Sequence, residues 1–442
     1  MYRQYMKQIG SKQQRTDMRT KSVKSDSSVK DLISDSVAVG HVNSETDGGV
    51  NGEMESERDL EHADFDCNSV NTRSSSKSQH RKLVLHFDIR NTVLVADSVT
   101  NVSVEQALNS FLTGVTWGRE GPEGEWQWHS DSLSLTPPAK DVITYYKYLE
   151  KKFVKNTTDR TQLRLATGDF THNEKGQIFH SHFLNHLELL KWRHEFDKPK
   201  HDVLTMSGAD GQQYNYIVPA VYKCIHHLIE TKRDFAVIFR TYGLDAPNVI
   251  KSLSHGLKGN HPGFPKPVSL PVDENIGTVN RSKTAPTEFI VYGKPEPEVL
   301  KGDRAIYDML SQKEGISGFR DDIHYWLENN YHHNTSKPLM IDPFDASVHH
   351  IFFDDNYRTY EEDSIIDIRL FDTKNASEAR SLKDFELAQF ENVCVVQADL
   401  IKCIEDEDYY VDRVAECETN YSKFLQKWAR FSRSMSVRQM LI

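Results

Sequence analysis

The sequence predicts an α/β protein built on a parallel β-sheet, and three apolar segments carry that prediction. Residues 83–88, 235–241 and 348–355 are apolar runs of strand length, and each ends in a carboxylate or a hydroxyl. Segments with apolar residues at helical spacing alternate with these runs, which is typical of parallel strands joined by crossover helices. In such sheets the carboxyl ends of the strands present polar side chains to a crevice.

The first predicted strand ends at Asp88. Further elements are predicted from the same patterns: a helix at residues 217–229, the strand at 235–241, a helix at 248–257, strands at 365–371 and 392–397, and helices through 399–428.

The connection between the first two strands predicts an inserted subdomain. About 140 residues separate them, far more than one crossover connection needs. We assign residues 97–231, with a helix at 140–153, to this insertion, and residues 81–96 plus 232–430 to the core. The prolines and glycines of residues 259–287 indicate a second, looser insertion.

Residues 1–80 have a separate composition and are predicted to be a disordered tail. The first thirty are basic and residues 31–66 are mainly acidic, with few large apolar side chains to offset chain entropy. A mitochondrial presequence is the alternative for the basic start, but lysines outnumber arginines there and no apolar stripe is evident.

Charge, hydropathy and cysteine usage predict a cytoplasmic protein. The formal net charge of -11 argues against nucleic acid as the main partner. No apolar run reaches the roughly 18 residues that span a bilayer, and five cysteines without metal-type spacing are typical of reduced thiols in the cytosol.

Four features occur in order along the chain: the strand that ends at Asp88, the strand that ends at Thr241, a lysine that precedes a proline (Lys294 or Lys337), and the strand that ends in Asp354 and Asp355. Together they resemble the four motifs of the haloacid dehalogenase superfamily. The resemblance implies a Rossmann-like parallel sheet core of haloacid dehalogenase type with a large inserted cap. It implies that Asp88 is the nucleophile and that the Thr241 hydroxyl bonds the transferring group. Asp88, Asp354 and Asp355 would hold Mg²⁺, a hard cation that prefers oxygen ligands.

Two lysines are candidates for the cation that this family places beside its nucleophile. Lys294 stands in Gly-Lys-Pro-Glu-Pro, which is similar to the family's Lys-Pro-x-Pro form, but it precedes Asp354 by sixty residues. Lys337 also precedes a proline and stands seventeen residues before Asp354, nearer to the usual separation. Both are retained as catalytic candidates, and Lys337 is favoured.

One departure from the family pattern bears on catalysis. Phosphatases of this family carry a second aspartate two positions after the nucleophile, where this chain has Arg90. A guanidinium cannot exchange protons, and general acid–base catalysis is worth about 10²–10⁴-fold. Dehalogenase members also lack this acid, so activity is not decided. Arg90 either clamps an anionic substrate or pairs with Asp88 and silences it. Asn91, in place of the usual glycine, and Thr92 complete the predicted substrate-binding segment.

Histidines supply weaker signals. His180, His182 and His186 form a cluster in which His182 and His186 share a helical face. Zinc would need a further ligand that nothing nearby supplies, so a structural role is predicted, with acid–base help from the cap as the alternative. Three doublets are likewise predicted to be structural: His226-His227, His332-His333 and His349-His350.

Two classes of function follow. The first is a Mg²⁺-dependent, phosphatase-like hydrolase that acts through Asp88 on a small phosphorylated or otherwise activated anionic substrate. The second is a catalytically impaired relative that binds a metabolite in its crevice, or a protein through its cap or tail. Neither class needs nucleic acid or a membrane. A replacement for the missing acid would favour the enzyme, whereas an ion pair from Arg90 to Asp88 or Asp354 would favour the binding protein.

Overall fold

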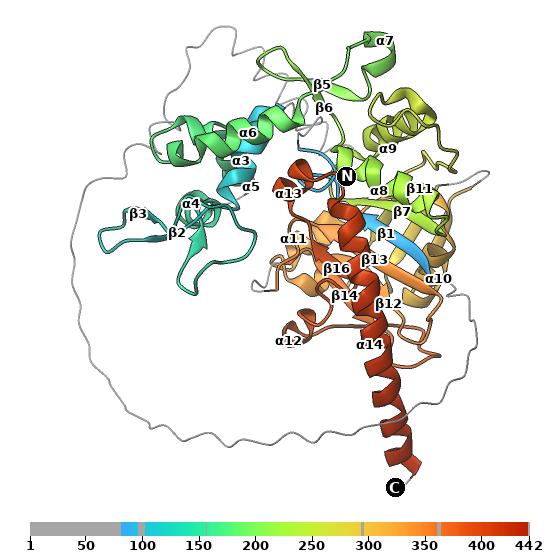
Figure 1. Ribbon diagram of the computed structural model, residues 1–442. Helices are drawn as coiled ribbons and strands as arrows, with labels where there is room; N and C mark the ends of the chain where they lie inside the picture. Colours follow the sequence, from blue (N-terminus) through green and yellow to red (C-terminus); the bar gives the residue numbers. More distant parts are fainter. Residues whose placement is uncertain (1–80, 96–101, 156, 293–295, 360–363, 441–442) are drawn as a thin grey trace, which may run out of the picture. The chain divides into compact units, whose positions relative to one another are not determined.

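The computed structural model describes residues 81–95, 102–155, 157–292, 296–359 and 364–440 (Figure 1). The predicted tail, residues 1–80, lies outside the described residues. Contacts divide the chain into two units, of which the smaller is described only at Glu120–Glu125. There the main chain turns, and Gly121 N donates to Glu125 O at 2.7 Å. The larger unit contains the sheets and helices that form the candidate site.

The larger unit is of the mixed α/β class, as predicted. Within the described residues its main sheet has eight strands in the order β10-β9-β8-β11-β7-β1-β13-β16. The strands from β8 to β16 in this order run parallel, whereas β9 is antiparallel to both of its neighbours. Their bounds are β1 Lys82–Phe87, β7 Phe235–Thr241, β8 Gly277–Asn280, β9 Glu288–Val291, β10 Glu298–Lys301, β11 Gly315–Arg320, β13 Val348–Asp354 and β16 Val395–Gln397.

Strand β1 lies inside the sheet, between β7 and β13, and both of its faces are covered. Leu83, Val84 and Leu85 are fully buried. Leu83 and Leu85 belong to one hydrophobic cluster and Val84 to another, and such two-sided burial makes a parallel strand a continuous apolar run. The chain places β7 and β11 on one side of β1 and, later, β13 and β16 on the other. Crevices form where strand order reverses in this way.

Helices cover both faces of the main sheet. The predicted helices at 217–229 and 248–257 are α8 (Pro219–Glu230) and α9 (Ala246–His255), which pack in the cluster of Leu83. On the opposite face lies α10 (Asp303–Gln312). The predicted C-terminal helical region divides into α13 (Leu400–Glu405) and α14 (Tyr409–Met440). None of the described helices is long and apolar enough to cross a membrane.

A second, smaller sheet packs beside β13. It has the order β12-β14-β15, with β12 (Lys337–Ile341) parallel to β14 (Ile366–Leu370) and β15 (Arg380–Ser381) antiparallel. Leu339 and Ile341 join Phe352 of β13 in one hydrophobic cluster. The predicted strand at 365–371 is therefore present as β14, but in this second sheet. Short helices flank it: α11 Ile323–Glu328, η4 His333–Thr335 and α12 Asp384–Leu387.

Aromatic rings gather in the segment between β1 and α8, and they belong to the same hydrophobic cluster as Leu83. The rings of Trp126, Trp128 and Tyr145 lie 5.1–5.3 Å apart between centroids. The helix predicted from residue 140 begins at Tyr145, because Thr144 caps it by accepting from Lys147 N at 3.2 Å.

Helix α8 falls inside the predicted insertion, 97–231, yet packs against α14. The elements are α3 Val104–Thr113, β2 Trp117–Glu120, β3 Trp126–Trp128, β4 Ile143–Thr144, α4 Tyr145–Phe153, α5 Thr157–Ala166, η1 Thr167–His172, η2 Gln177–Phe179, α6 His180–Leu190, α7 Lys198–His201, β5 Thr205–Ser207 and β6 Gln213–Asn215.

A buried ion pair joins β7 to the end of β11. Arg240 Nε and Nη2 donate to the two carboxylate oxygens of Asp321 at 2.9 and 2.5 Å, and the two side chains are 0% and 1% exposed. Arg240 Nη1 also donates to Pro338 O at 3.2 Å. This guanidinium therefore ties the main sheet to β12 of the second sheet.

Replacing Asp321 with alanine would leave the Arg240 charge buried without its partner. We expect Asp321→Ala to lower the free energy of unfolding by about 3–5 kcal/mol. In the double variant Asp321→Ala/Arg240→Met the stranded charge is gone, so the loss should be smaller than for Asp321→Ala alone. Urea unfolding measures both, and an equal or larger loss in the double variant would contradict this account of the pair.

Candidate active site

Three of the predicted site residues stand at the carboxyl ends of adjacent parallel strands. Asp88 follows β1 directly, Thr241 ends β7 and Asp354 ends β13. Strand β1 pairs with both neighbours, and the register sets Phe87 opposite Phe353. Asp88 and Asp354 therefore leave the sheet side by side, where the strand order reverses.

Lys337 connects these two aspartates. Its Nζ donates to Asp88 Oδ1 at 2.5 Å, to Asp354 Oδ2 at 2.8 Å and to the carbonyl of Arg240 at 3.3 Å. An ammonium has three N–H donors, so each of them has an acceptor although Lys337 is only 1% exposed. Burial acts to lower the pKa of Lys337, but Asp354 and Asp88 raise it above its ordinary value. The side chain is a buried ammonium.

The second sheet brings Lys337 to this position. Lys337 is the first residue of β12, and its main-chain N–H donates to Ile365 O at 3.1 Å, beside β14. Leu339 and Ile341, further along β12, are buried against Phe352 of β13. Packing of the strand thus holds the lysine against the end of the main sheet.

Asp355 completes a cluster of three carboxylates. One oxygen from each of Asp88, Asp354 and Asp355 lies within 4.8 Å of the others. Asn91 Nδ2 donates to Asp355 Oδ2 at 3.1 Å, and Asn356 Nδ2 donates to Oδ1 at 2.9 Å. Convergent carboxylate oxygens are the donor set that a hard divalent cation takes, so these residues fit Mg²⁺.

Burial, together with an excess of negative charge, raises two pKa values in the cluster. Burial raises the pKa of Asp88 well above its usual range, with Lys337 opposing the rise and Asp354 adding to it. Burial and then the neighbouring Asp354 raise the pKa of Asp355 to about 7. In the absence of a cation, Asp355 is therefore partly protonated at neutral pH.

The turn after Asp88 explains an asparagine that the family resemblance did not predict. Asn91 has φ of 57°, in the left-handed region that glycine adopts most readily and asparagine tolerates. Its main-chain N–H donates to Leu94 O at 2.8 Å, and Val93 N donates to Ile89 O at 2.9 Å. The tight turn directs the Asn91 side chain to Asp355.

Arg90 and Thr92 occupy different environments within this turn. Arg90 is half-buried and forms an isolated β-bridge with Leu94. Thr92 is fully buried, and its carbonyl accepts a hydrogen bond from the Tyr410 hydroxyl at 2.6 Å. Among the described residues, no group pairs with the Thr92 hydroxyl. The hydrogen bond from Tyr410 to the Thr92 carbonyl anchors the turn to α14.

The remaining predicted catalytic residues are less closely connected to the cluster. Thr241 is buried at the end of β7, and its hydroxyl accepts the Gly243 N–H at 2.9 Å. Lys294 lies outside the described residues, so its role stays a prediction.

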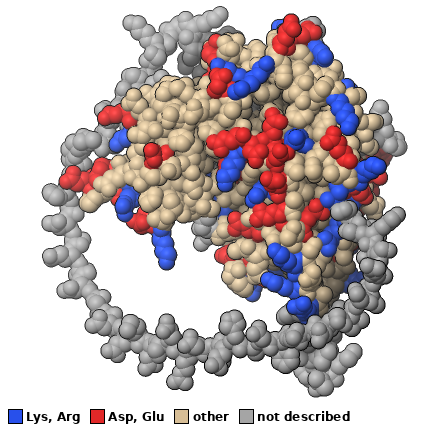
Figure 2. Space-filling view, in the orientation of Figure 1, with Lys and Arg blue, Asp and Glu red and all other residues tan. Residues whose placement is uncertain are grey.

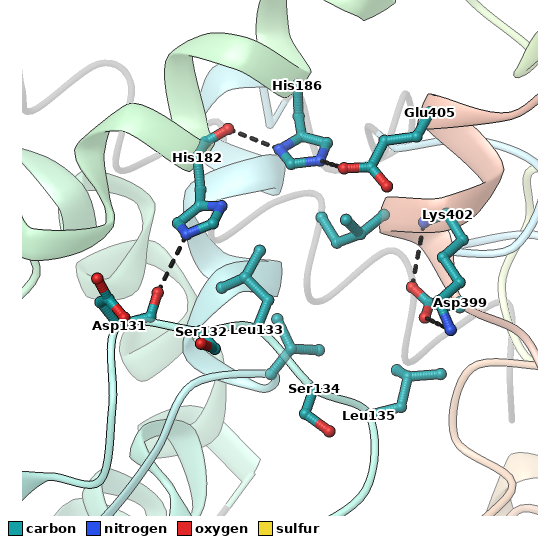
Figure 3. A pocket seen from close by; sticks show the side chains of 12 residues that line it. Asp131, Ser132, Leu133, Ser134, Leu135, His182, His186, Asp399, Lys402 and Glu405 are labelled. Atoms are coloured by element: carbon teal, nitrogen blue, oxygen red, sulfur yellow. Dashed lines mark hydrogen bonds and ion pairs between the residues drawn. The ribbon is translucent and has the colours of Figure 1, made fainter.

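A cleft of about 440 Å³ lies between the inserted segment and α13 (Figure 3). Its lining does not include Asp88 or Asp354, but Gln397 pairs with Asp354 just before α13 begins. His186 on α6 spans the cleft: its Nδ1 lies 2.6 Å from His182 O and its Nε2 lies 2.9 Å from Glu405 Oε1. The lining includes Asp399, two residues after Gln397 in the chain.

The connection from α13 to α14 is acidic. Glu405–Asp408 are exposed, and Figure 2 shows Asp and Glu side chains gathered on the face that carries α13 and the start of α14. The third histidine of the predicted cluster, His180, packs edge-on against His172 instead of lining the cleft.

Two residues beside the acid cluster and one that lines the cleft were not predicted from the sequence. The sequence could have indicated a role for Arg240, since an arginine inside an apolar strand needs a buried partner. Asn356 stands two residues after Asp354 and donates its N–H to Asp354 Oδ1 at 2.9 Å, a local turn that its spacing suggests. Glu405 had no signal, because its partner His186 is 219 residues away.

Comparisons with known proteins found no relatives. No protein-family model, no curated protein and no solved structure matches the chain. A functional conclusion for this protein therefore rests on the geometry of the site.

Asp355 should make stability depend on pH when no divalent cation is present. The pKa of its carboxyl is about 7 in the folded protein and about 3.9 in an unfolded chain. The folded state therefore binds more protons between these values, and the free energy of unfolding falls as the pH rises from about 4 to 7. Asp355→Asn should reduce this fall, whereas Asp308→Asn, on the exposed side of α10, should not. An unchanged slope in Asp355→Asn, measured by urea unfolding in EDTA, would contradict the assignment.

Mg²⁺ should raise the melting temperature, because binding to the folded state alone stabilises it by mass action. The rise should be larger at pH 8 than at pH 6, since a proton on Asp355 competes with the cation. Asp354→Asn should abolish the rise in thermal unfolding experiments, and Asp308→Asn should retain it. A full response to Mg²⁺ in Asp354→Asn would place the ion elsewhere.

Proposed function

We propose that the protein is a Mg²⁺-dependent hydrolase of the haloacid dehalogenase-like type, with Asp88 as the nucleophile and a small phosphorylated or anionic substrate. One observation carries the proposal: Lys337 bridges Asp88 and Asp354 at the ends of adjacent parallel strands, with Asp355 completing the acid cluster. The core with an insertion after its first strand supports the same type, since a cap at that place excludes water from the crevice. Free buried cysteines, Cys224, Cys394, Cys403 and Cys417, support the cytoplasmic location that we propose.

In the proposed reaction, Asp88 attacks phosphorus. A bond from its carboxylate oxygen to phosphorus forms as the bond to the leaving oxygen breaks, and water then cleaves the acyl phosphate to restore Asp88 and release phosphate. Lys337 would orient Asp88 and offset the charge of the transferring group, and Thr241 would donate its hydroxyl to that group. Mg²⁺ held by Asp88, Asp354 and Asp355 would supply further charge neutralisation.

The proton balance favours particular substrates. Arg90 occupies the place of the family's acid and cannot protonate a leaving oxygen. Acyl and aryl phosphates leave as weakly basic anions that need no proton, so they suit this site better than alkyl phosphates. The second candidate function is binding without turnover. It rests on Arg90 as well, because loss of the acid is what a catalytically impaired member would show.

Arg90→Asp and Asp88→Asn together distinguish the two functions. If the site is intact, Arg90→Asp restores an acid two residues after the nucleophile, and turnover of an alkyl phosphate should rise by up to about 10²–10⁴-fold. Adding Asp88→Asn should erase the gain, since an amide is not a nucleophile. The measurement is phosphate release from a panel of phosphorylated metabolites and an aryl phosphate, with and without Mg²⁺.

Each outcome of that panel assigns a function. Turnover of the aryl phosphate by the unsubstituted protein that Asp88→Asn abolishes supports the hydrolase. Turnover that persists in Asp88→Asn refutes Asp88 as the nucleophile. The binding function stands if neither the unsubstituted protein nor Arg90→Asp turns over any member of the panel.

A further inference from the structure

A second group of potential metal ligands lies away from the acid cluster, where two short helices meet. His332 precedes η4, His333 begins it, and Asp384 is the first residue of α12. One nitrogen of each ring and one oxygen of Asp384 all lie within 4.8 Å of one another. His333 Nε2 is 2.7 Å from Asp384 Oδ1.

One nitrogen of each ring contacts a neighbouring side chain: Nε2 of His333 lies against Asp384, and Nδ1 of His332 lies against Asn334. His333 is 2% exposed, and its Nδ1 has no hydrogen-bond partner in the part of the chain that the structure describes. An unpaired polar atom in such a place costs free energy. His332 Nδ1 lies 2.9 Å from Asn334 Oδ1. Asn334 N lies 3.4 Å from the same Nδ1, which accepts its N–H in the tautomer that carries the ring proton on Nε2. In the other tautomer Nδ1 donates to Asn334 Oδ1 and Nε2 presents its lone pair, which is the arrangement found in metal-bound histidines.

We propose that His332, His333 and Asp384 bind one transition-metal ion of the Zn²⁺ class. Two imidazole nitrogens and a carboxylate oxygen are ligands that zinc takes, with water in the fourth position. Ligand atoms at about 2.1 Å from a tetrahedral ion are about 3.4 Å apart. His333 Nε2 and Asp384 Oδ1 are 2.7 Å apart, a hydrogen-bond distance, so these two atoms would have to separate by about 0.7 Å to hold an ion between them. The Asp384 side chain, 71% exposed, is free to rotate by this amount. The sequence pattern had suggested only a structural histidine doublet.

The site would hold in place the segment that delivers Lys337. The carbonyl of His333 accepts from Ser336 N at 3.1 Å and from Ser336 Oγ at 2.5 Å, and Lys337 follows directly. At the other ligand, α12 is tied to the strand end of the acid cluster, because Leu387 O accepts from the Tyr357 hydroxyl at 3.0 Å. A metal ion here therefore has a structural role, cross-linking η4, which precedes β12 in the chain, to α12, which follows β15.

Titration of the full chain with Zn²⁺ and Co²⁺ tests this site. Excess Mg²⁺ is kept present throughout so that the three carboxylates of the acid cluster are already engaged. Calorimetry should find one equivalent of Zn²⁺, and Co²⁺ should give the visible absorption of a tetrahedral site with nitrogen and oxygen ligands. Loss of an outer-shell partner already weakens metal sites by about 10–100-fold, so Asp384→Ala and His332→Ala should each weaken binding at least tenfold.

Matched variants make the result specific. Asp384 and His332 are not fully buried, so their replacement should leave the fold intact, which thermal unfolding without metal verifies. His227→Ala removes an exposed histidine from another doublet, and Asp355→Asn alters the acid cluster; neither should change Zn²⁺ affinity. The proposal is refuted if no Zn²⁺ binds in the presence of Mg²⁺, or if Asp384→Ala and His332→Ala bind it as tightly as the unsubstituted protein.

Discussion

The burial of the Lys337 ammonium between Asp88 and Asp354 is the interaction on which the rest of the structure depends. A charge that is removed from water destabilises the fold unless it is paired and fully hydrogen-bonded. Lys337 meets that condition with two carboxylates and the carbonyl of Arg240. Because the lysine begins β12 whereas the aspartates follow β1 and end β13, satisfying one charge brings the second sheet against the carboxyl edge of the first.

The same constraint leaves the site short of positive charge. Asp88, Asp354 and Asp355 share the Lys337 ammonium, and the raised pKa values of Asp88 and Asp355 result from burial and from their mutual repulsion. The amides of Asn91 and Asn356 donate to Asp355 but carry no charge. A divalent cation would balance the charge of the cluster, which is why we propose that these carboxylates hold a metal ion.

The sequence was sufficient to predict the strand ends and was insufficient for what lies between them. Asp88 and Asp354 could be predicted because apolar runs stop at carboxylates, and such runs are a local signal. β11 was not predicted, since Gly315 and Gly318 interrupt its apolar pattern although the strand is buried between β7 and β8. Its separation from Asp354 favoured Lys337 over Lys294, but the sequence did not say how Lys337 reaches the acid cluster. That information is in the pairing of β12 with β14, which no local pattern contains.

Trapping of a phosphorylated Asp88 would test the central claim most directly. The protein is mixed with Mg²⁺ and an aryl phosphate, quenched in acid within the first turnover and treated with borohydride, which reduces an aspartyl phosphate to homoserine. Tandem mass spectrometry of the peptide that spans β1 then locates the modification. The account predicts reduction at Asp88 that requires both Mg²⁺ and substrate and is absent in Lys337→Met. Release of phosphate with an unmodified Asp88, or with the modification on another carboxylate, would contradict it.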